Sequence, residues 1–213
     1  MLRGPDRLDV QSGRTSAVLP VVLLFFALPV LALDPRKLVT QYAHEVWRQG
    51  DGLPQDSVRA IAQTRDGYLW LGTQAGLARF DGVRFTVFDK SNTKEIQNDH
   101  ILALAAAADG SLWIGTRGGG VNRLKDGQFT SYTTREGLSN GMVRSILVDT
   151  RGTVWIGTEG GLNRFQAGRF QVYTTREGLA HNVVRAILED RRGRLWLGTD
   201  GGLCRFDGQG AAH

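Results

Sequence analysis

A tryptophan-containing pentapeptide occurs four times in this chain of 213 residues. It reads LWLGT at 69–73 and returns with small changes at 112–116, 154–158 and 195–199. The tryptophans stand 43, 42 and 41 residues apart, at Trp70, Trp113, Trp155 and Trp196. One such strand in every unit of about 40 residues is typical of four-stranded propeller blades. The sequence therefore predicts an all-β array of four blades, forming a partial or small propeller.

Each repeat has glycine turns where a four-stranded meander needs them. Asp66-Gly67 precedes the Trp70 strand, and Asp81-Gly82 separates the third expected strand from the fourth. Asp-Gly is typical of tight type I′ hairpins, in which both central residues have positive φ. The later repeats vary the residue before the glycine but keep the glycine, which tolerates positive φ without a Cβ clash. Each unit is thus expected to hold four antiparallel strands joined by short turns.

The repeated tryptophans are expected to be structural residues that pack one blade against the next. A tryptophan side chain removes about 150 to 250 Å² from water when it is buried. The four residues lie inside strands with Leu, Val and Ile neighbours. Aromatic residues that stack on a ligand would be expected in loops instead.

An export signal precedes the repeats. Three arginines lie upstream of an apolar run at 17–31, and Val30-Leu31-Ala32 suits cleavage after Ala32. The run is about 15 residues long, whereas a helix that spans a membrane needs roughly 20, so membrane attachment is expected only if the segment stays uncleaved. The predicted divisions are a helical signal peptide at 1–32, a strand and linker at 33–51, repeats at 52–95, 96–136, 137–177 and 178–210, and a tail at 211–213.

Charge and motifs argue against several functional classes. The formal net charge is +5, but the basic residues are scattered and three belong to the signal segment, so no nucleic-acid partner is expected. Cys204 is the single cysteine, which rules out an internal disulfide. The glycine run at 118–120 lacks the Gly-Lys-Ser/Thr of a phosphate loop. With no catalytic or metal-ligand motif, we expect no catalytic residues, no metal, no cofactor and no enzyme activity.

Arginine recurs at one place on the innermost expected strand. Arg59, Arg144 and Arg185 hold this place in the first, third and fourth units, and Leu102 holds it in the second. If these strands line a central channel, the arginines would form a cationic ring suited to an acidic sugar or another anion. The alternative is that each arginine pairs with a neighbouring aspartate or carbonyl. His100 and His181, in the loops between units, are expected to be surface residues.

The order of linker, tryptophan strand and glycine-turned hairpin resembles the two-component regulator propeller repeat. The resemblance rests on GLPQDSV at 52–58, DGYLWLGT at 66–73, GLARFDG at 76–82 and Phe85, and it extends over about residues 40–208. In that family the repeats form the periplasmic sensor of membrane proteins, in propellers of about seven blades. A histidine kinase or diguanylate cyclase normally follows, and none is recognisable in this chain.

The resemblance therefore implies an extracytoplasmic sensing module, in the periplasm or on the outer face of the inner membrane. Its ligand would be a small molecule or a glycan, and it would lack the output domain. The alternative is a freestanding propeller that binds a glycan or a protein, or a propeller hydrolase or lyase. Downstream reading frames would discriminate between these classes.

The ends of the array admit two arrangements. Residues 40–47 are expected to form an outer strand that places Trp47 where later units have Tyr132 and Tyr173, and the last unit lacks that strand. Pairing of 40–47 with 203–206 would close a four-bladed ring. Alternatively the chain is an open arc of a truncated product, because Gly210 stands where phenylalanine is expected. The arc is the preferred arrangement, and its end faces would bind further blades or self-associate.

Overall fold

The computed structural model describes residues 44–207 and 211–212. The chain divides into two units, residues 1–44 and 45–213, and nearly all the described residues belong to the second. The predicted signal peptide at 1–32 and the first four residues of the strand predicted at 40–47 lie outside the described residues, as do residues 208–210. Within the described part of the chain, no helix is long and apolar enough to cross a membrane.

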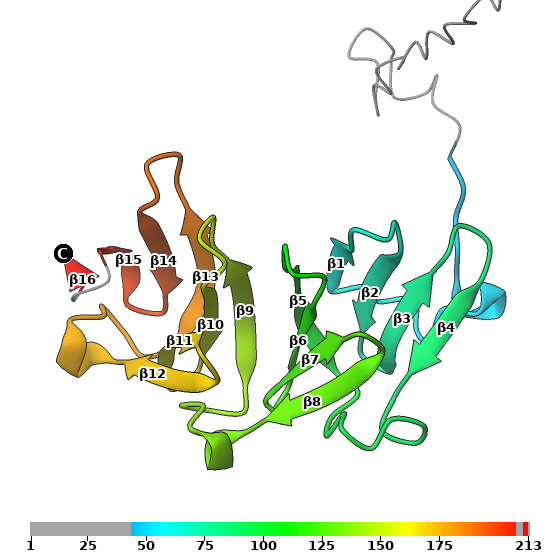
Figure 1. The fold of residues 1–213 in the computed structure, drawn as a ribbon, viewed down its shortest axis with the longest axis horizontal. Coiled ribbons are helices and arrows are strands. Elements are labelled where there is room, and N and C mark those ends of the chain that lie inside the picture. The colour runs from blue at the N-terminus through cyan, green and yellow to red at the C-terminus, as the bar shows by residue number, and fades with distance from the viewer. Residues whose placement is uncertain (1–43, 208–210, 213) are drawn as a thin grey trace, which may run out of the picture. The chain divides into compact units, whose positions relative to one another are not determined.

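Four antiparallel sheets of four strands each make up the second unit (Figure 1). We call them blades 1 to 4. Blades 1 and 2 contain β1 (Ala60–Gln63), β2 (Leu69–Thr73), β3 (Gly76–Phe80), β4 (Phe85–Phe88), β5 (Ile101–Ala106), β6 (Leu112–Thr116), β7 (Val121–Lys125) and β8 (Gln128–Tyr132). Blades 3 and 4 contain β9 (Val143–Val148), β10 (Val154–Thr158), β11 (Gly161–Gln166), β12 (Arg169–Tyr173), β13 (Val184–Glu189), β14 (Leu195–Thr199), β15 (Gly202–Phe206) and β16 (Ala211–Ala212). The predicted all-β propeller class is confirmed.

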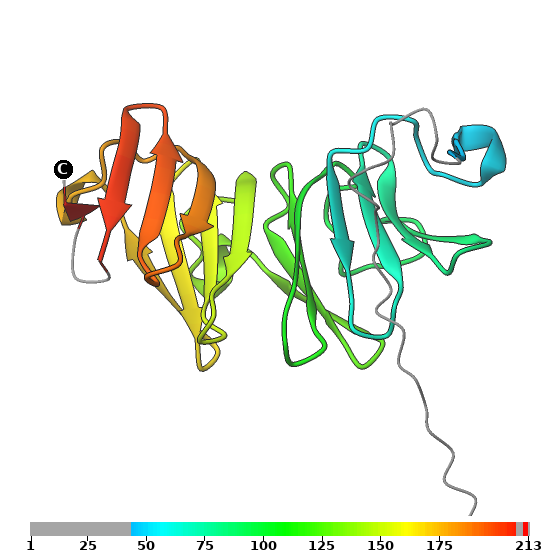
Figure 2. The same cartoon turned by 90° about the horizontal axis from the view of Figure 1, so that it is seen from above.

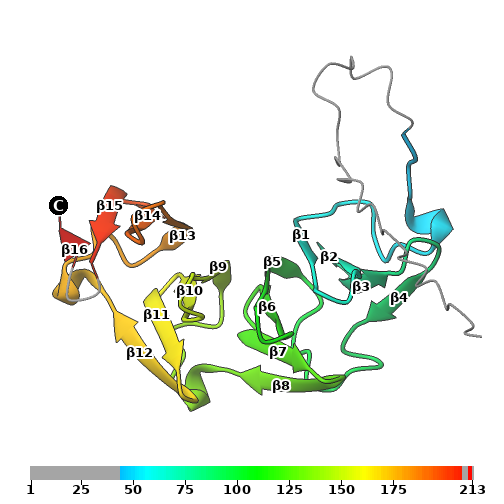
Figure 3. The same ribbon diagram turned by 45° about the horizontal axis from the view of Figure 1, so that its top comes forward.

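Consecutive blades meet through their first, innermost strands. β1 lies beside β5, β5 beside β9, and β9 beside β13 (Figure 3). The helical elements of the described residues are three single 3-10 turns, η2 (Gln49–Asp51), η3 (Thr134–Glu136) and η4 (Thr175–Glu177), which lead into blades 1, 3 and 4. Each is closed by a capping box; in η3 the Thr133 N–H donates to Glu136 Oε2 at 2.7 Å.

The apolar core lies between the blades, where the sheets pack face to face (Figure 2). Each cluster joins the tryptophan strand of one blade to the strands of the following one: Trp70 packs with Leu112, Trp113 with Val154, and Trp155 with Leu195. Trp70, Trp113 and Trp155 are buried, with exposed fractions of 2 to 5%. Trp196 has the same place in blade 4 and stays partly buried.

The hairpins correct one sequence expectation. Asp126 and Gly127 both have positive φ, 51° and 76°, as the type I′ turn predicts. At Asp66-Gly67, however, the glycine alone has positive φ, and its N–H donates to the Thr64 carbonyl across a longer loop. Asp81-Gly82 is likewise no type I′ turn, because Gly82 alone has positive φ; the Asp81 carboxylate accepts the N–H groups of Val83 and Arg84. The glycine fits all these turns, whereas type I′ geometry also requires a two-residue loop.

Both ends of the array depart from the closed-ring arrangement. Contrary to the sequence analysis, the last blade has a fourth strand, because β16 pairs with Arg205 and Phe206 of β15. Both edges of β15 are therefore paired at these two residues. Trp47 instead contacts Phe80 of blade 1, with ring centroids 5.0 Å apart. The structure thus agrees with the open arrangement of blades.

Candidate binding site on the inner rim

An extra residue interrupts the pairing of the innermost strand with its neighbour in blades 2, 3 and 4. The register between β9 and β10 skips Arg144, and the registers of β5 and β13 skip Leu102 and Arg185 in the same way. Such a β-bulge re-aims one side chain out of the regular alternation of a strand. The position that the sequence singled out is therefore the position at which each of these strands is bulged.

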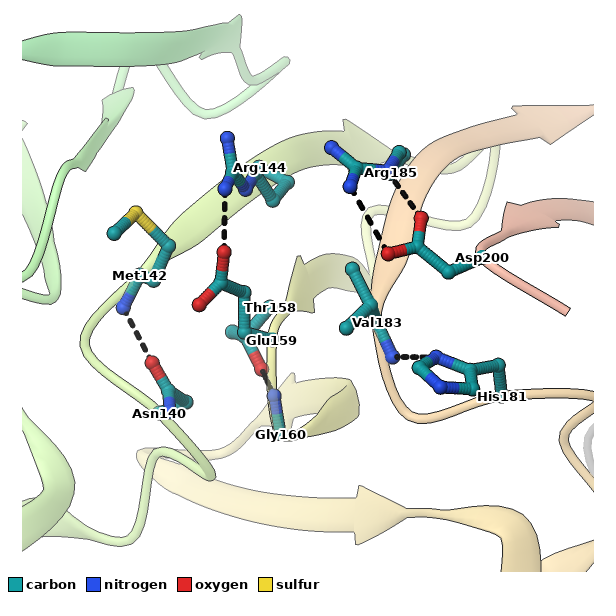
Figure 4. Close-up of polar contacts among 10 residues, drawn as sticks. All are labelled: Asn140, Met142, Arg144, Thr158, Glu159, Gly160, His181, Val183, Arg185 and Asp200. Atoms are coloured by element: carbon teal, nitrogen blue, oxygen red, sulfur yellow. Dashed lines mark hydrogen bonds and ion pairs between the residues drawn. The ribbon is translucent and has the colours of Figure 1, made fainter.

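The turn after the Gly-Thr of each tryptophan strand meets this bulge. Arg144 binds Glu159 of blade 3 through its Nη2, and Arg185 binds Asp200 of blade 4 through Nε and, at 2.9 Å, Nη2 (Figure 4). The backbone ties the same two segments together, because the Glu159 N–H donates to the Met142 carbonyl at 3.2 Å. We call these bulge positions, the matching position Arg59 of blade 1, which is not bulged, and the turn residue after each Gly-Thr the inner rim.

The rim groups of blades 3 and 4 form one electrostatic cluster. The hydrogen bond from Arg185 lowers the pKa of Asp200, and the charges of His181 and Arg144 act in the same direction. Asp200 in turn raises the pKa of Arg185, with a smaller contribution from Glu159. Two arginines thus face two carboxylates, so this half of the rim carries little net charge.

The rim of blades 1 and 2 is different. The residues that correspond to Glu159 are Gln74 in blade 1 and Arg117 in blade 2. Among the described residues neither Arg59 nor Arg117 has an ion-pair partner, and both side chains are exposed. Both charges act on His100, whose pKa is lowered first by burial and then by Arg117 and Arg59. This half of the rim is cationic.

The sequence-predicted residues therefore fall into two groups. Arg144 and Arg185 are paired with carboxylates, which is the alternative that the sequence left open, and Arg59 is not paired. The sequence analysis did not identify Arg117, because arginine occurs at its position in blade 2 alone and therefore does not recur with the repeat. The feature that could have identified it is its position directly after the Gly-Thr of the tryptophan strand. Chemically, Arg59 and Arg117 offer two guanidinium groups to an anion.

The two histidines of the interblade loops have distinct surroundings. His181 is exposed, and its Nδ1 accepts the Val183 N–H at 3.0 Å, just as Asn140 accepts the Met142 N–H at 2.7 Å. His100 is partly buried, and its Nε2 has no hydrogen-bond partner among the described residues. No group of three or more His, Cys, Asp or Glu in the described part of the chain is arranged to hold a metal ion.

Comparison with protein families gives one match in every blade. The model of the two component regulator propeller family matches residues 52–75, 95–118, 137–160 and 178–201. Each segment runs from an interblade loop through the innermost strand and the tryptophan strand to the rim turn. Among curated proteins, histidine kinase P4 of Formosa agariphila is 35% identical over 75 residues, which is 35% of this chain and 5% of the kinase.

Solved structures share the fold at low identity. The extracellular domain of a protein described as a one component system of B. thetaiotaomicron has a TM-score of 0.63 and 22% identity, over 75% of this chain and 24% of that chain. Virginiamycin B lyase of Staphylococcus aureus has a TM-score of 0.59 and 15% identity, over 73% of this chain and 54% of the lyase. These likenesses show a propeller fold. With a family match in every blade, the four blades of this chain are two component regulator propeller repeats.

Proposed function

We propose that the chain supplies the extracytoplasmic ligand-sensing propeller of a two-component or cyclic-di-GMP signalling protein. The family match in all four blades supports this proposal, as does the likeness to an extracellular domain of a one component system. The predicted export signal at 1–32 would place the blades outside the cytoplasm. The blades detect the ligand, and a domain other than the blades supplies the output activity.

The observation that carries the proposed recognition is the uneven charge of the inner rim. Arg59 and Arg117 lie around His100 without an ion-pair partner in the described structure, whereas Arg144 and Arg185 are already bound to carboxylates. A free guanidinium forms strong, charge-assisted hydrogen bonds with a carboxylate. The ligand we propose is therefore an acidic glycan, whose carboxylates bind Arg59 and Arg117.

Isothermal titration of the full chain with trigalacturonate tests this recognition. We expect binding that weakens as salt is added, because exposed charges are screened. Replacing both arginines (Arg59→Gln with Arg117→Gln) should weaken binding by at least about tenfold. The matched control is Arg169→Gln, an exposed arginine at the start of β12. Equal binding by wild type and the double variant would contradict the assigned site.

The same titration separates the proposal from its main alternative. A neutral oligosaccharide that binds as well as trigalacturonate, with no dependence on Arg59 or Arg117, would favour a freestanding glycan-binding propeller. Location is tested independently by expressing the full chain and fractionating the cells. We expect the mature protein in the periplasm with Leu33 as its first residue, and an intact N-terminus in the cytoplasm would contradict export.

A further inference from the structure

Hollows of similar construction lie between blades 1 and 2 and between blades 2 and 3, at the end of the blades opposite the inner rim. The one between blades 2 and 3 has a volume of about 400 Å³, within the range of small-molecule sites. Ala107, Trp113 and Arg123 line it from blade 2, and Val148 and Phe165 line it from blade 3. None of these residues belongs to the inner rim.

Trp113 differs from the other three repeat tryptophans at this place. The indole N–H groups of Trp70, Trp155 and Trp196 donate to Thr64, Asp149 and Asp190, each at 2.9 Å. Ala107 is the residue of blade 2 that corresponds to Asp149, because both make the same backbone hydrogen bond. The Ala107 N–H donates to the Ser111 carbonyl at 2.8 Å, and the Asp149 N–H donates to the Thr153 carbonyl at 2.9 Å.

Alanine provides no side-chain acceptor. Trp113 Nε1 therefore has no hydrogen-bond partner among the described residues, although the side chain is 2% exposed. The nitrogen itself is not among the buried polar atoms that lack a partner in the described structure, so it can be reached from the hollow that Trp113 lines. The side chain thus presents an unused donor at the wall of the hollow.

The interface between blades 3 and 4 contains two hydrogen bonds that the interface between blades 2 and 3 lacks. There the Thr150 backbone N–H and Oγ1 both donate to the Glu189 carboxylate, each at 2.8 Å. Ala108 and Val148 occupy the corresponding positions between blades 2 and 3. Ala108 and Val148 cannot make the two hydrogen bonds that connect blades 3 and 4. The interface between blades 2 and 3 therefore keeps a hollow, and its wall is apolar at these positions.

The charges around the hollow favour an anion. Arg123 Nη2 and Lys125 Nζ share one oxygen of Asp109, at 2.7 and 3.1 Å, and Arg151 lines the hollow from blade 3. Arg123 Nε is buried without a hydrogen-bond partner in the described structure. Three cations therefore face one carboxylate. Hydrogen bonds from Ser111 and Lys125 outweigh burial and hold the pKa of that carboxyl well below its usual range, so it stays charged.

We propose that this hollow binds a small carboxylate with an apolar body. The carboxylate accepts a hydrogen bond from Trp113 Nε1 and is attracted by the guanidinium charges of Arg123 and Arg151, and the apolar body packs against Val148 and Phe165. The site uses an indole donor that blade 2 leaves unpaired, and it is separate from the acidic-glycan site proposed on the inner rim.

Benzoate is the probe for this site. In the full chain labelled with ¹⁵N-tryptophan, benzoate should shift the indole N–H resonance of Trp113 and leave that of Trp155 in place, since Asp149 already holds it. Benzamide, which has the same ring without the charge, should bind at least about tenfold more weakly. A Trp113 resonance that does not move with benzoate, or equal affinity for benzamide, would overturn the proposal.

Ala107→Asp is the decisive variant, because it installs the acceptor that Asp149 and Asp190 supply in the next two blades. It should weaken benzoate binding at Trp113 by at least about tenfold while the protein stays folded. If that variant fails to fold, Ala108→Thr with Val148→Glu rebuilds the contact seen between Thr150 and Glu189 and should weaken binding similarly. The rim double variant at Arg59 and Arg117 should bind benzoate normally, so failure at one site is distinguishable from failure at the other. Unchanged affinity in a folded hollow variant would refute the site.

Discussion

Blades 3 and 4 have closely similar sequences and very different exposure. The tryptophan strand and the next strand read VWIGTEGGLNRF at 154–165 and LWLGTDGGLCRF at 195–206. Every residue of β10 is buried, whereas only Leu195 and Leu197 of β14 are buried and its other three residues are partly buried. The contrast is largest between Leu162, with an exposed fraction of 0%, and Leu203, with 69%.

The difference shows that the neighbouring blade determines which face is covered. β13 of blade 4 packs against β9 and β10, but no further blade covers blade 4 within the described residues. Blade 1 shows the complementary face: Leu69 is 37% exposed, whereas Leu112 and Leu195 at the same position are 1% and 6% exposed. The meander is thus encoded within each repeat, and burial of its faces comes from the adjoining repeats.

Replacing Trp155 and replacing its counterpart Trp196 should differ most in their effect on the free energy of unfolding. Trp155→Ala is expected to lower the free energy of unfolding by about 3 to 5 kcal/mol, as for other buried large aromatics. Trp196→Ala should cost at most about 2 kcal/mol, because that side chain is already partly exposed. Urea denaturation of the full chain followed by circular dichroism measures both. Equal losses would mean that a neighbouring surface covers Trp196 in solution.

Leu162 and Leu203 test the effect of burial on stability alone, because leucine side chains form no hydrogen bonds. Leu162→Ala should destabilise by about 2 to 5 kcal/mol, because it leaves a cavity between blades 3 and 4. Leu203→Ala should stay within about 0.5 kcal/mol of wild type, as for other surface substitutions. The same urea titrations provide the comparison. A large loss at Leu203 would contradict its exposure.

The glycines that open β11 and β15 should give a smaller difference. Gly161 and Gly202 both have positive φ, 136° and 110°. A Cβ at Gly161 would lie 2.4 Å from the Tyr173 carbonyl oxygen, whereas at Gly202 it would meet nothing within 4 Å. We expect Gly202→Ala to cost about 1 kcal/mol from strain and Gly161→Ala at least about 1 kcal/mol more from the clash. Thermal unfolding midpoints would reveal the order, and the reverse order would contradict the close approach of the Tyr173 carbonyl to Gly161.

The smallest expected effect is a pH dependence in blade 4. Hydrogen bonds, first from the Trp196 indole, lower the pKa of Asp190. A lowered folded-state pKa contributes stability above the unfolded value of about 3.9 and loses it as the pH falls through the folded value. Asp190→Asn should therefore reduce the melting temperature at pH 6, with a difference from wild type that shrinks below about pH 4. A difference that grows with acidity would contradict the assignment.

The sequence predicted the parts of the fold that recur at a fixed period. The tryptophan spacing predicted four blades, and the repeat pattern placed Trp47 in the position that Tyr132 has in a later unit. The Trp47 to Phe80 contact at 5.0 Å indeed matches the Tyr132 to Phe165 contact at 5.1 Å. The type I′ turn at Asp66-Gly67 was wrong, because loop length and not the dipeptide alone decides the turn.

The candidate site was less predictable because it depends on pairings between segments. A bulge at Arg144 is a property of the register between β9 and β10, which periodicity does not specify. Whether an arginine is neutralised depends on the turn opposite it: Glu159 faces Arg144, whereas Gln74 corresponds to it in blade 1. A pattern of recurring residues also overlooks departures from the repeat, such as Arg117 and Ala107.

Hydrogen exchange of the full chain, measured by mass spectrometry, tests whether the adjoining blade determines how strongly the backbone amides of similar segments are protected. It compares the peptides that contain β10 and β11 with those that contain β14 and β15. We expect the amides of 154–165 to exchange much more slowly than those of 195–206, because blade 4 covers blade 3 and opening there exposes a packed face. Equal protection of the two segments would contradict the claim.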